Sequence, residues 1–106
     1  MINITFKPKT MELEIIGHAG HGNKGKDIVC SAVSCLFYTL GENLYENIWM
    51  LEEAPIFKDE DGEGYISCIP KKEFAGSVSL IYWTILNGMK MVADNYKKNV
   101  KFRVEE

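Results

Sequence analysis

The sequence has no Cys-x-x-Cys pair, no excess of basic residues and no long apolar run. Its three cysteines are Cys30, Cys35 and Cys68, an odd number whose spacing excludes a disulfide framework and a zinc ribbon. The net charge of −3 argues against a basic face for nucleic acid. No stretch approaches the roughly 18 apolar residues of a membrane span, and the first residues lack the pattern of a signal peptide. We therefore expect a reduced, cytoplasmic protein without membrane or nucleic-acid contacts.

The length and composition are those of one globular domain. At 106 residues the chain is close to the commonest domain size, and we expect a single domain over residues 1–106. Hydrophobic residues make up 46% of it, which is enough to build a core without disulfides or a structural metal.

Hydrophobic periodicity predicts the order of the secondary-structure elements. Alternating apolar and polar residues predict five strands, over residues 2–6, 11–16, 48–57, 64–69 and 100–104. Apolar residues at helical spacing predict one helix after Asp27 and a second over residues 72–96. The acidic segment 58–63 lacks the carboxylate spacing of a calcium loop and is interpreted as a solvated turn. The result is an α+β fold of order ββαββαβ, with two helices packed on one face of a five-stranded, mostly antiparallel sheet.

The second predicted helix is apolar nearly all round in its middle. Its sheet-facing stripe leaves out Leu80, Tyr82, Trp83, Leu86 and Met91. A helix of this kind is covered on more than one side. Because the domain has only two helices, we expect a homodimer joined partly through this one.

A glycine-rich loop follows the second predicted strand. Four glycines fall within residues 17–25, which disfavours regular structure. We expect a mobile loop that is disordered or displaced without substrate and orders over a bound peptide, with Gly20, Gly22 and Gly25 supplying its freedom.

His18 and Cys30 stand at the two ends of this loop and are the candidate reactive pair. With Asp27 as N-cap, Cys30 is the third helical residue, where free amides and the helix dipole favour a thiolate. A thiolate and an imidazole base are the minimum apparatus for acyl transfer, and the same amides could hold an oxyanion. On the residues alone, Cys30 could equally be a small core residue, and Asp27 could either cap the helix only or also orient His18.

The remaining cysteines and the second histidine have simpler interpretations. Cys35 and Cys68 are expected to be core residues. A zinc site built from Cys30, His18 and His21 would have three ligands of mixed reach in a loop, whereas structural zinc normally has four. We therefore expect no metal and no cofactor.

Three short motifs in this region resemble a known family. Gly-His-Ala at 17–19, Gly-Lys-Asp-Ile-Val-Cys at 25–30 and Ala-Val-Ser at 32–34 together resemble the signature of the bacterial ribosomal-processing cysteine protease (Prp) family. The predicted element order and the length are similar to that family over essentially the whole chain. The resemblance implies a homodimeric endopeptidase that removes a short N-terminal extension from a large-subunit ribosomal protein.

The resemblance also implies roles for individual residues. His18 matches the catalytic histidine, Cys30 the catalytic cysteine, and Asp27 and Ser34 the supporting residues of the motif. Ser31 replaces a more usual alanine, and His21 adds a second histidine inside the loop. Two other functions stay open: a non-catalytic module that binds a ribosomal protein, and another small cysteine hydrolase such as a thioesterase or amidase.

Overall fold

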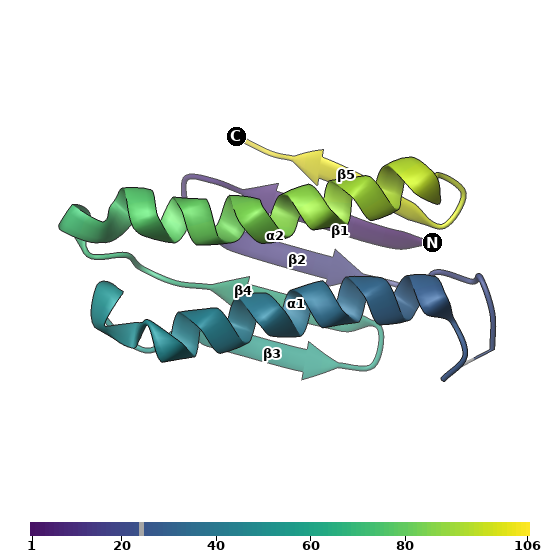
Figure 1. Ribbon diagram of the computed structural model, residues 1–106, viewed down its shortest axis with the longest axis horizontal. Coiled ribbons are helices and arrows are strands. Elements are labelled where there is room, and N and C mark those ends of the chain that lie inside the picture. Colours follow the sequence, from purple (N-terminus) through teal and green to yellow (C-terminus); the bar gives the residue numbers. More distant parts are fainter. Residues whose placement is uncertain (24) are drawn as a thin grey trace.

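Two helices lie side by side across one face of a five-stranded sheet (Figure 1). The computed structural model describes residues 1–23 and 25–106, so Lys24 of the predicted mobile loop lies outside the described residues. The elements are β1 (Ile2–Lys7), β2 (Glu12–Ile16), α1 (Ile28–Glu46), η1 (Ile48–Met50), β3 (Ile56–Glu60), β4 (Glu63–Ser67), η2 (Lys72–Phe74), α2 (Ala75–Asn95) and β5 (Val100–Val104), where η1 and η2 are 3₁₀ turns. The predicted order ββαββαβ and the two-layer arrangement are confirmed.

The strand order brings several chain segments to one end of the sheet. The strands run β3-β4-β2-β1-β5, and among the described strands β1 and β5 alone pair in parallel, with Ile2 opposite Val100. Ile16 at the end of β2 pairs with Asn3 on one side and with Glu63 on the other. The end of β2, the starts of β1 and β5 and the β3–β4 hairpin therefore meet where the chain enters α1.

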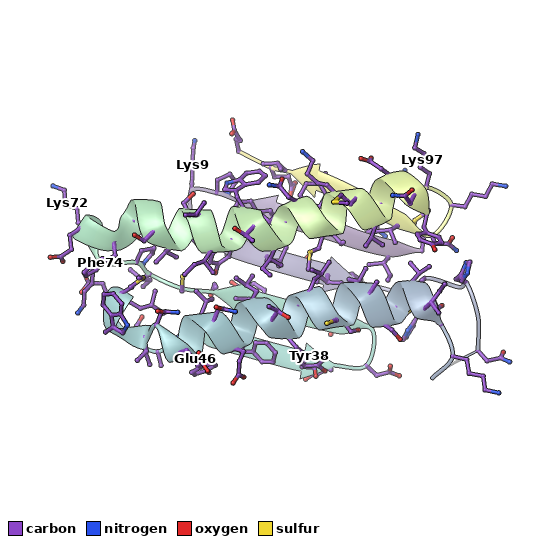
Figure 2. All side chains as sticks on the ribbon, viewed as in Figure 1. Lys9, Tyr38, Glu46, Lys72, Phe74 and Lys97 are labelled. Carbon is purple, nitrogen blue, oxygen red and sulfur yellow. The ribbon has the colours of Figure 1, made fainter. Side chains whose placement is uncertain are left out.

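The third strand begins later in the chain than predicted, at Ile56, and ends later, at Glu60. Residues 48–50 form η1, and the ring of Trp49 packs edge to face on Phe74, 5.0 Å between centroids, at the end of the molecule where α2 begins (Figure 2). Pro55 has no N–H to give to a ladder, so β3 begins only after it. β3 then continues through most of the acidic segment, which leaves Asp61 and Gly62 as the turn, with φ +76° at Gly62.

The apolar surface of α2 is covered largely from within the chain. Tyr82 and Leu86 are fully buried, so the prediction that they face a second subunit is wrong. The Tyr82 hydroxyl donates to the Met11 carbonyl at 2.9 Å, and its burial raises the pKa of that phenol. α2 also packs closely on α1: a Cβ added at Gly88 would come within 2.9 Å of the Leu36 side chain. The helix is apolar all round because both the sheet and α1 contact it.

α1 is the one helix of the described residues that is long and apolar enough, by length and composition alone, to cross a membrane. This corrects the expectation that no segment reaches that threshold. Core helices of soluble proteins pass the same test, and five apolar side chains of α1 are buried in the core: Val29, Val33, Phe37, Leu40 and Leu44.

The two cysteines outside the candidate site differ in environment. Cys35 is exposed, so its prediction as a core residue is wrong, whereas Cys68 is only 6% exposed and lies 3.5 Å from the Tyr82 hydroxyl. We expect Cys35→Ala to change the free energy of unfolding by less than about 0.5 kcal/mol and Cys68→Ala to lower it by about 1–2 kcal/mol. Urea unfolding of both variants measures the difference, and equal losses would contradict it.

Candidate active site

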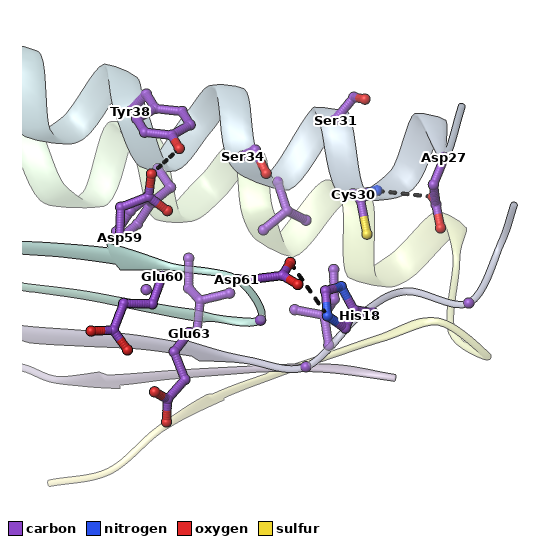
Figure 3. Close-up of a pocket in the computed structure, with 18 of the residues that line it drawn as sticks. His18, Asp27, Cys30, Ser31, Ser34, Tyr38, Asp59, Glu60, Asp61 and Glu63 are labelled. Atoms are coloured by element: carbon purple, nitrogen blue, oxygen red, sulfur yellow. Dashed lines mark hydrogen bonds and ion pairs between the residues drawn. The ribbon is translucent and has the colours of Figure 1, made fainter. Parts of the chain in front are cut away.

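An open pocket of about 660 Å³ lies between the start of α1, the end of β2 and the β3–β4 hairpin. Cys30, Ser34 and Tyr38 line it from α1, four residues apart and therefore on one face of the helix (Figure 3). The sulfur of Cys30 points into the pocket, on the side where His18 lies. Tyr38 donates a hydrogen bond to Asp59 of β3 across the far end, which raises the pKa of the tyrosine.

Asp27 is the N-cap of α1, as predicted, and it also anchors the loop. One of its carboxylate oxygens accepts from the amides of Val29 and Cys30, both at 3.0 Å. The other accepts from the amides of His21 at 2.9 Å and Gly22 at 3.2 Å. These bonds hold the pKa of the Asp27 carboxyl below its ordinary value, and the bond from the Cys30 amide has the largest effect. Asp27 thus joins the helix start to the loop through four backbone amides rather than through His18.

The amides that begin α1 were expected to be available to hold an oxyanion beside the Cys30 sulfur. The amides of Val29 and Cys30 are already bonded to Asp27. Instead, the amide of Ala19 donates to the sulfur at 3.3 Å. Among the described residues, the donor to the sulfur of the candidate nucleophile therefore comes from the loop and not from the helix.

His18 lies at the pocket edge beside the tip of the β3–β4 hairpin. Its Nε2 is 3.7 Å from a carboxylate oxygen of Asp61, and both side chains are well exposed (Figure 3). The Gly17 amide donates to the Gly62 carbonyl at 2.8 Å, which fixes the strand end against the hairpin. A Cβ at Gly62 would stand 3.0 Å from Nε2, so a residue without one suits this contact. Within the described residues, His18 and Cys30 share the pocket but no hydrogen bond joins them.

The second histidine is directed elsewhere. The ring of His21 packs edge to face on Tyr96, with centroids 5.4 Å apart, and it is not among the residues that line the pocket. Of the two imidazoles, the one matching the motif is the one placed at the pocket.

The four loop glycines line the pocket, and three of them have left-handed backbone, beginning with Gly17 at φ +107°. Gly20 has φ +69° and Gly25 has φ +83°, where alanine would be strained, whereas Gly22 has ordinary backbone. Because Asp27 already binds the amides of His21 and Gly22, we expect those two to exchange slowly in the free protein and the Gly20 amide to exchange fast.

Ordering of this loop over substrate stays a prediction. A bound peptide should slow exchange at Gly20 with little change at His21, measured by amide hydrogen exchange with Cys30→Ala protein to prevent turnover. Slow exchange at Gly20 in the free protein, unchanged by peptide, would contradict loop gating.

Two residues beside the candidate pair of His18 and Cys30 were not identified from the sequence. Asp61 was interpreted as part of a solvated turn, and only the pairing of β2 with β4 places it at His18. Asn99 donates from its side-chain amide to the Ala19 carbonyl at 2.9 Å, across 80 residues of chain. Neither has a local pattern that could have revealed it. No group of three His, Cys, Asp or Glu residues placed to hold a metal ion occurs in the part of the chain that the structure describes.

A cysteine at a helix start, with its sulfur open to a groove that also holds an imidazole, is typical of a thiol hydrolase. The family model described as "Cysteine protease Prp" matches residues 1–101. The chain therefore belongs to this family of cysteine proteases.

Relatives and solved structures agree with this assignment. Two proteins of Staphylococcus aureus, from strains Mu50 and NCTC 8325, are named ribosomal processing cysteine protease Prp; each is 24% identical over 100 residues, 94% of this chain and 92% of the relative. The crystal structure of the S. aureus protease with a covalently linked product peptide superposes with a TM-score of 0.81 at 22% identity, over 99% of this chain and 100% of the other. SMU.848 from Streptococcus mutans gives a TM-score of 0.67 at 25% identity, over 97% and 90% of the two chains.

Proposed function

We propose that this chain is a cysteine endopeptidase that removes a short N-terminal extension from a large-subunit ribosomal protein, with Cys30 as nucleophile and His18 as base. The observation that carries the proposal is the Cys30 sulfur, directed into an open groove of about 660 Å³ with His18 at its edge. The relatives' name supports ribosomal processing, and their solved structures include complexes with a substrate peptide and with a covalently linked product peptide. Membership in a protease family favours this function over a binding module or a thioesterase.

The residues support a two-step acyl transfer. The Cys30 thiolate attacks the scissile carbonyl, and the imidazolium of His18 gives its proton to the leaving amine, which is the new N-terminus of the ribosomal protein. The extension is then held on Cys30 as a thioester. His18, now neutral, takes a proton from water, whose oxygen displaces the thiolate and releases the extension as a free acid.

The charge of the pocket supports a basic substrate. Four acidic residues of the β3–β4 hairpin line the groove, Asp59, Glu60, Asp61 and Glu63, while none of its described lining residues is Lys or Arg. Asp61 points toward His18 and Asp59 toward Tyr38, whereas Glu60 and Glu63 extend outward (Figure 3). Proteins that bind ribosomal RNA carry an excess of lysine and arginine to neutralise phosphates. A peptide from such a protein complements this acidic wall.

The assembly and location of the enzyme are part of the same proposal. We propose a homodimer and a cytoplasmic enzyme; its three unpaired cysteines are compatible with a reducing compartment. The apolar side chains that α2 leaves to a partner are Leu80 and Met91, 69% and 66% exposed and on one face of the helix. Sedimentation showing only monomer at micromolar concentration would contradict the dimer.

Cleavage of ribosomal protein precursors tests the function itself. Large-subunit proteins of the same cell, expressed with their native N-termini, are incubated with the enzyme and their intact masses measured. We expect one precursor to lose a short N-terminal peptide, and Cys30→Ala to leave it whole. Hydrolysis of small thioesters or amides with every precursor left intact would favour the other hydrolases instead.

A further inference from the structure

Asn99 holds the loop residue whose amide contacts the reactive sulfur. Asn99 lies in the turn between α2 and β5, and its side-chain amide donates to the Ala19 carbonyl at 2.9 Å. Ala19 is 2% exposed, and its own amide donates to the Cys30 sulfur at 3.3 Å. Both polar backbone groups of this buried residue are therefore used, one toward the sulfur and one toward Asn99.

The backbone of Asn99 is fixed independently of its side chain. Its amide donates to the Tyr96 carbonyl and its carbonyl accepts from the Ile2 amide, both at 2.8 Å. These bonds tie the residue to the end of α2 and the start of β1. A side-chain substitution at Asn99 removes the contact with Ala19 and leaves both backbone bonds in place.

The hydrogen bond from Asn99 to Ala19 bears on the reaction because Ala19 in turn donates to the Cys30 sulfur. A thiolate is stabilised by a hydrogen-bond donor, and the first-turn amides of α1 are bonded to Asp27. Of the described backbone amides, the one bonded to the sulfur is that of Ala19, and Ala19 directly follows His18 in the chain.

We propose that Asn99 is a positioning residue for the reactive pair. By holding Ala19, it keeps an N–H on the Cys30 sulfur and keeps the adjacent His18 at the edge of the pocket. This inference rests on the proposed function, in which Cys30 is the nucleophile.

Substitution at Asn99 with a matched asparagine control tests the inference. Asn99→Ala removes the donor, and Asn99→Asp keeps the shape but sets a carboxylate against the Ala19 carbonyl. The control is Asn95→Ala, because the Asn95 amide donates only within α2, to Met91 at 2.8 Å. We expect both Asn99 variants to lower kcat about tenfold with KM within about twofold, since the contact acts on the nucleophile and not on the peptide.

Alkylation by iodoacetamide, mapped by mass, gives a readout that needs no substrate. The rate at Cys30 should fall about tenfold in the Asn99 variants, while the exposed Cys35 of the same molecules keeps its rate and serves as an internal standard. Folded Asn99 variants with wild-type kcat and wild-type Cys30 alkylation would overturn the inference, as would a raised KM with unchanged kcat. Precursor cleavage by Cys30→Ala would instead refute the proposed function, and the alkylation rates would still decide on Asn99.

Discussion

Replacing Cys30 by alanine is expected to reduce kcat/KM for the precursor by at least about a thousandfold. In the proposed mechanism the sulfur forms the thioester, and alanine offers no nucleophile. Cys30→Ser should be similarly inactive, because a serine hydroxyl is not ionised at neutral pH and is a far weaker nucleophile than a thiolate. The fold should persist, since Cys30 is only partly buried and its side chain accepts one hydrogen bond from the described residues, that of the Ala19 amide.

The matched control for Cys30 is Cys35, five residues further along α1 and therefore on a different face of the helix. Its thiol is exposed and outside the residues that line the pocket, so Cys35→Ala should keep wild-type kcat and KM. Precursor cleavage at the normal rate by folded Cys30→Ala, checked by circular dichroism, would refute the assignment of the nucleophile.

Replacing Asp27 by alanine is expected to affect stability and activity together. The carboxylate is 5% exposed and accepts four amides, two that begin α1 and two in the loop. Loss of the helix cap should lower Tm by roughly 5–10 °C in a domain of this size. Loss of the loop anchor should lower kcat well beyond that, because the loop carries the Ala19 amide to Cys30.

Asp27→Asn separates the two roles of the carboxylate. Asparagine caps a helix about as well as aspartate, but its NH₂ group cannot accept from the amides of His21 and Gly22. We expect this variant to keep most of the wild-type Tm and to lose most of the activity. An Asp27→Asn enzyme with wild-type kcat would show that the loop anchor is dispensable.

The contribution of Asp27 to stability should depend on pH with a definite sign. Its pKa is lower in the folded protein than in the unfolded chain, where it is about 3.9, because backbone amides bind the charged form. The stabilisation is therefore fully present above about pH 4 and is lost as pH falls through the lower folded value. The Tm difference between wild type and Asp27→Ala should be constant near neutral pH and shrink below about pH 4.

The parts of the site that depend on local sequence could be predicted. Helix geometry alone relates an N-cap to a cysteine three residues later. The predicted places of Asp27 at the N-cap and of Cys30 in the first turn of α1 therefore agree with the structure. Four strands likewise follow from alternation. The start of the third was misplaced because residues 48–55 are apolar enough to look extended, yet Pro55 and the packing of Trp49 on Phe74 oppose a ladder there.

The parts that depend on long-range packing could not be predicted. Tyr82 and Leu86 looked like interface residues because the sequence does not show that α1 and the sheet contact α2 from two sides. Asp61 meets His18 through the register of β4 on β2, and Asn99 meets Ala19 through the parallel pairing of β5 with β1. Strand register is decided by the whole sheet, so no short sequence pattern predicts that these residues are in contact.

The most direct test of the central claim is the intact mass of the enzyme, acid-quenched during turnover of the ribosomal protein precursor. We predict a transient adduct that equals the mass of the released extension less one water, mapped by fragmentation to Cys30 and absent in Cys30→Ala. An adduct on any other residue, or a precursor still shortened by Cys30→Ala, would contradict the proposal that Cys30 is the nucleophile of a processing protease.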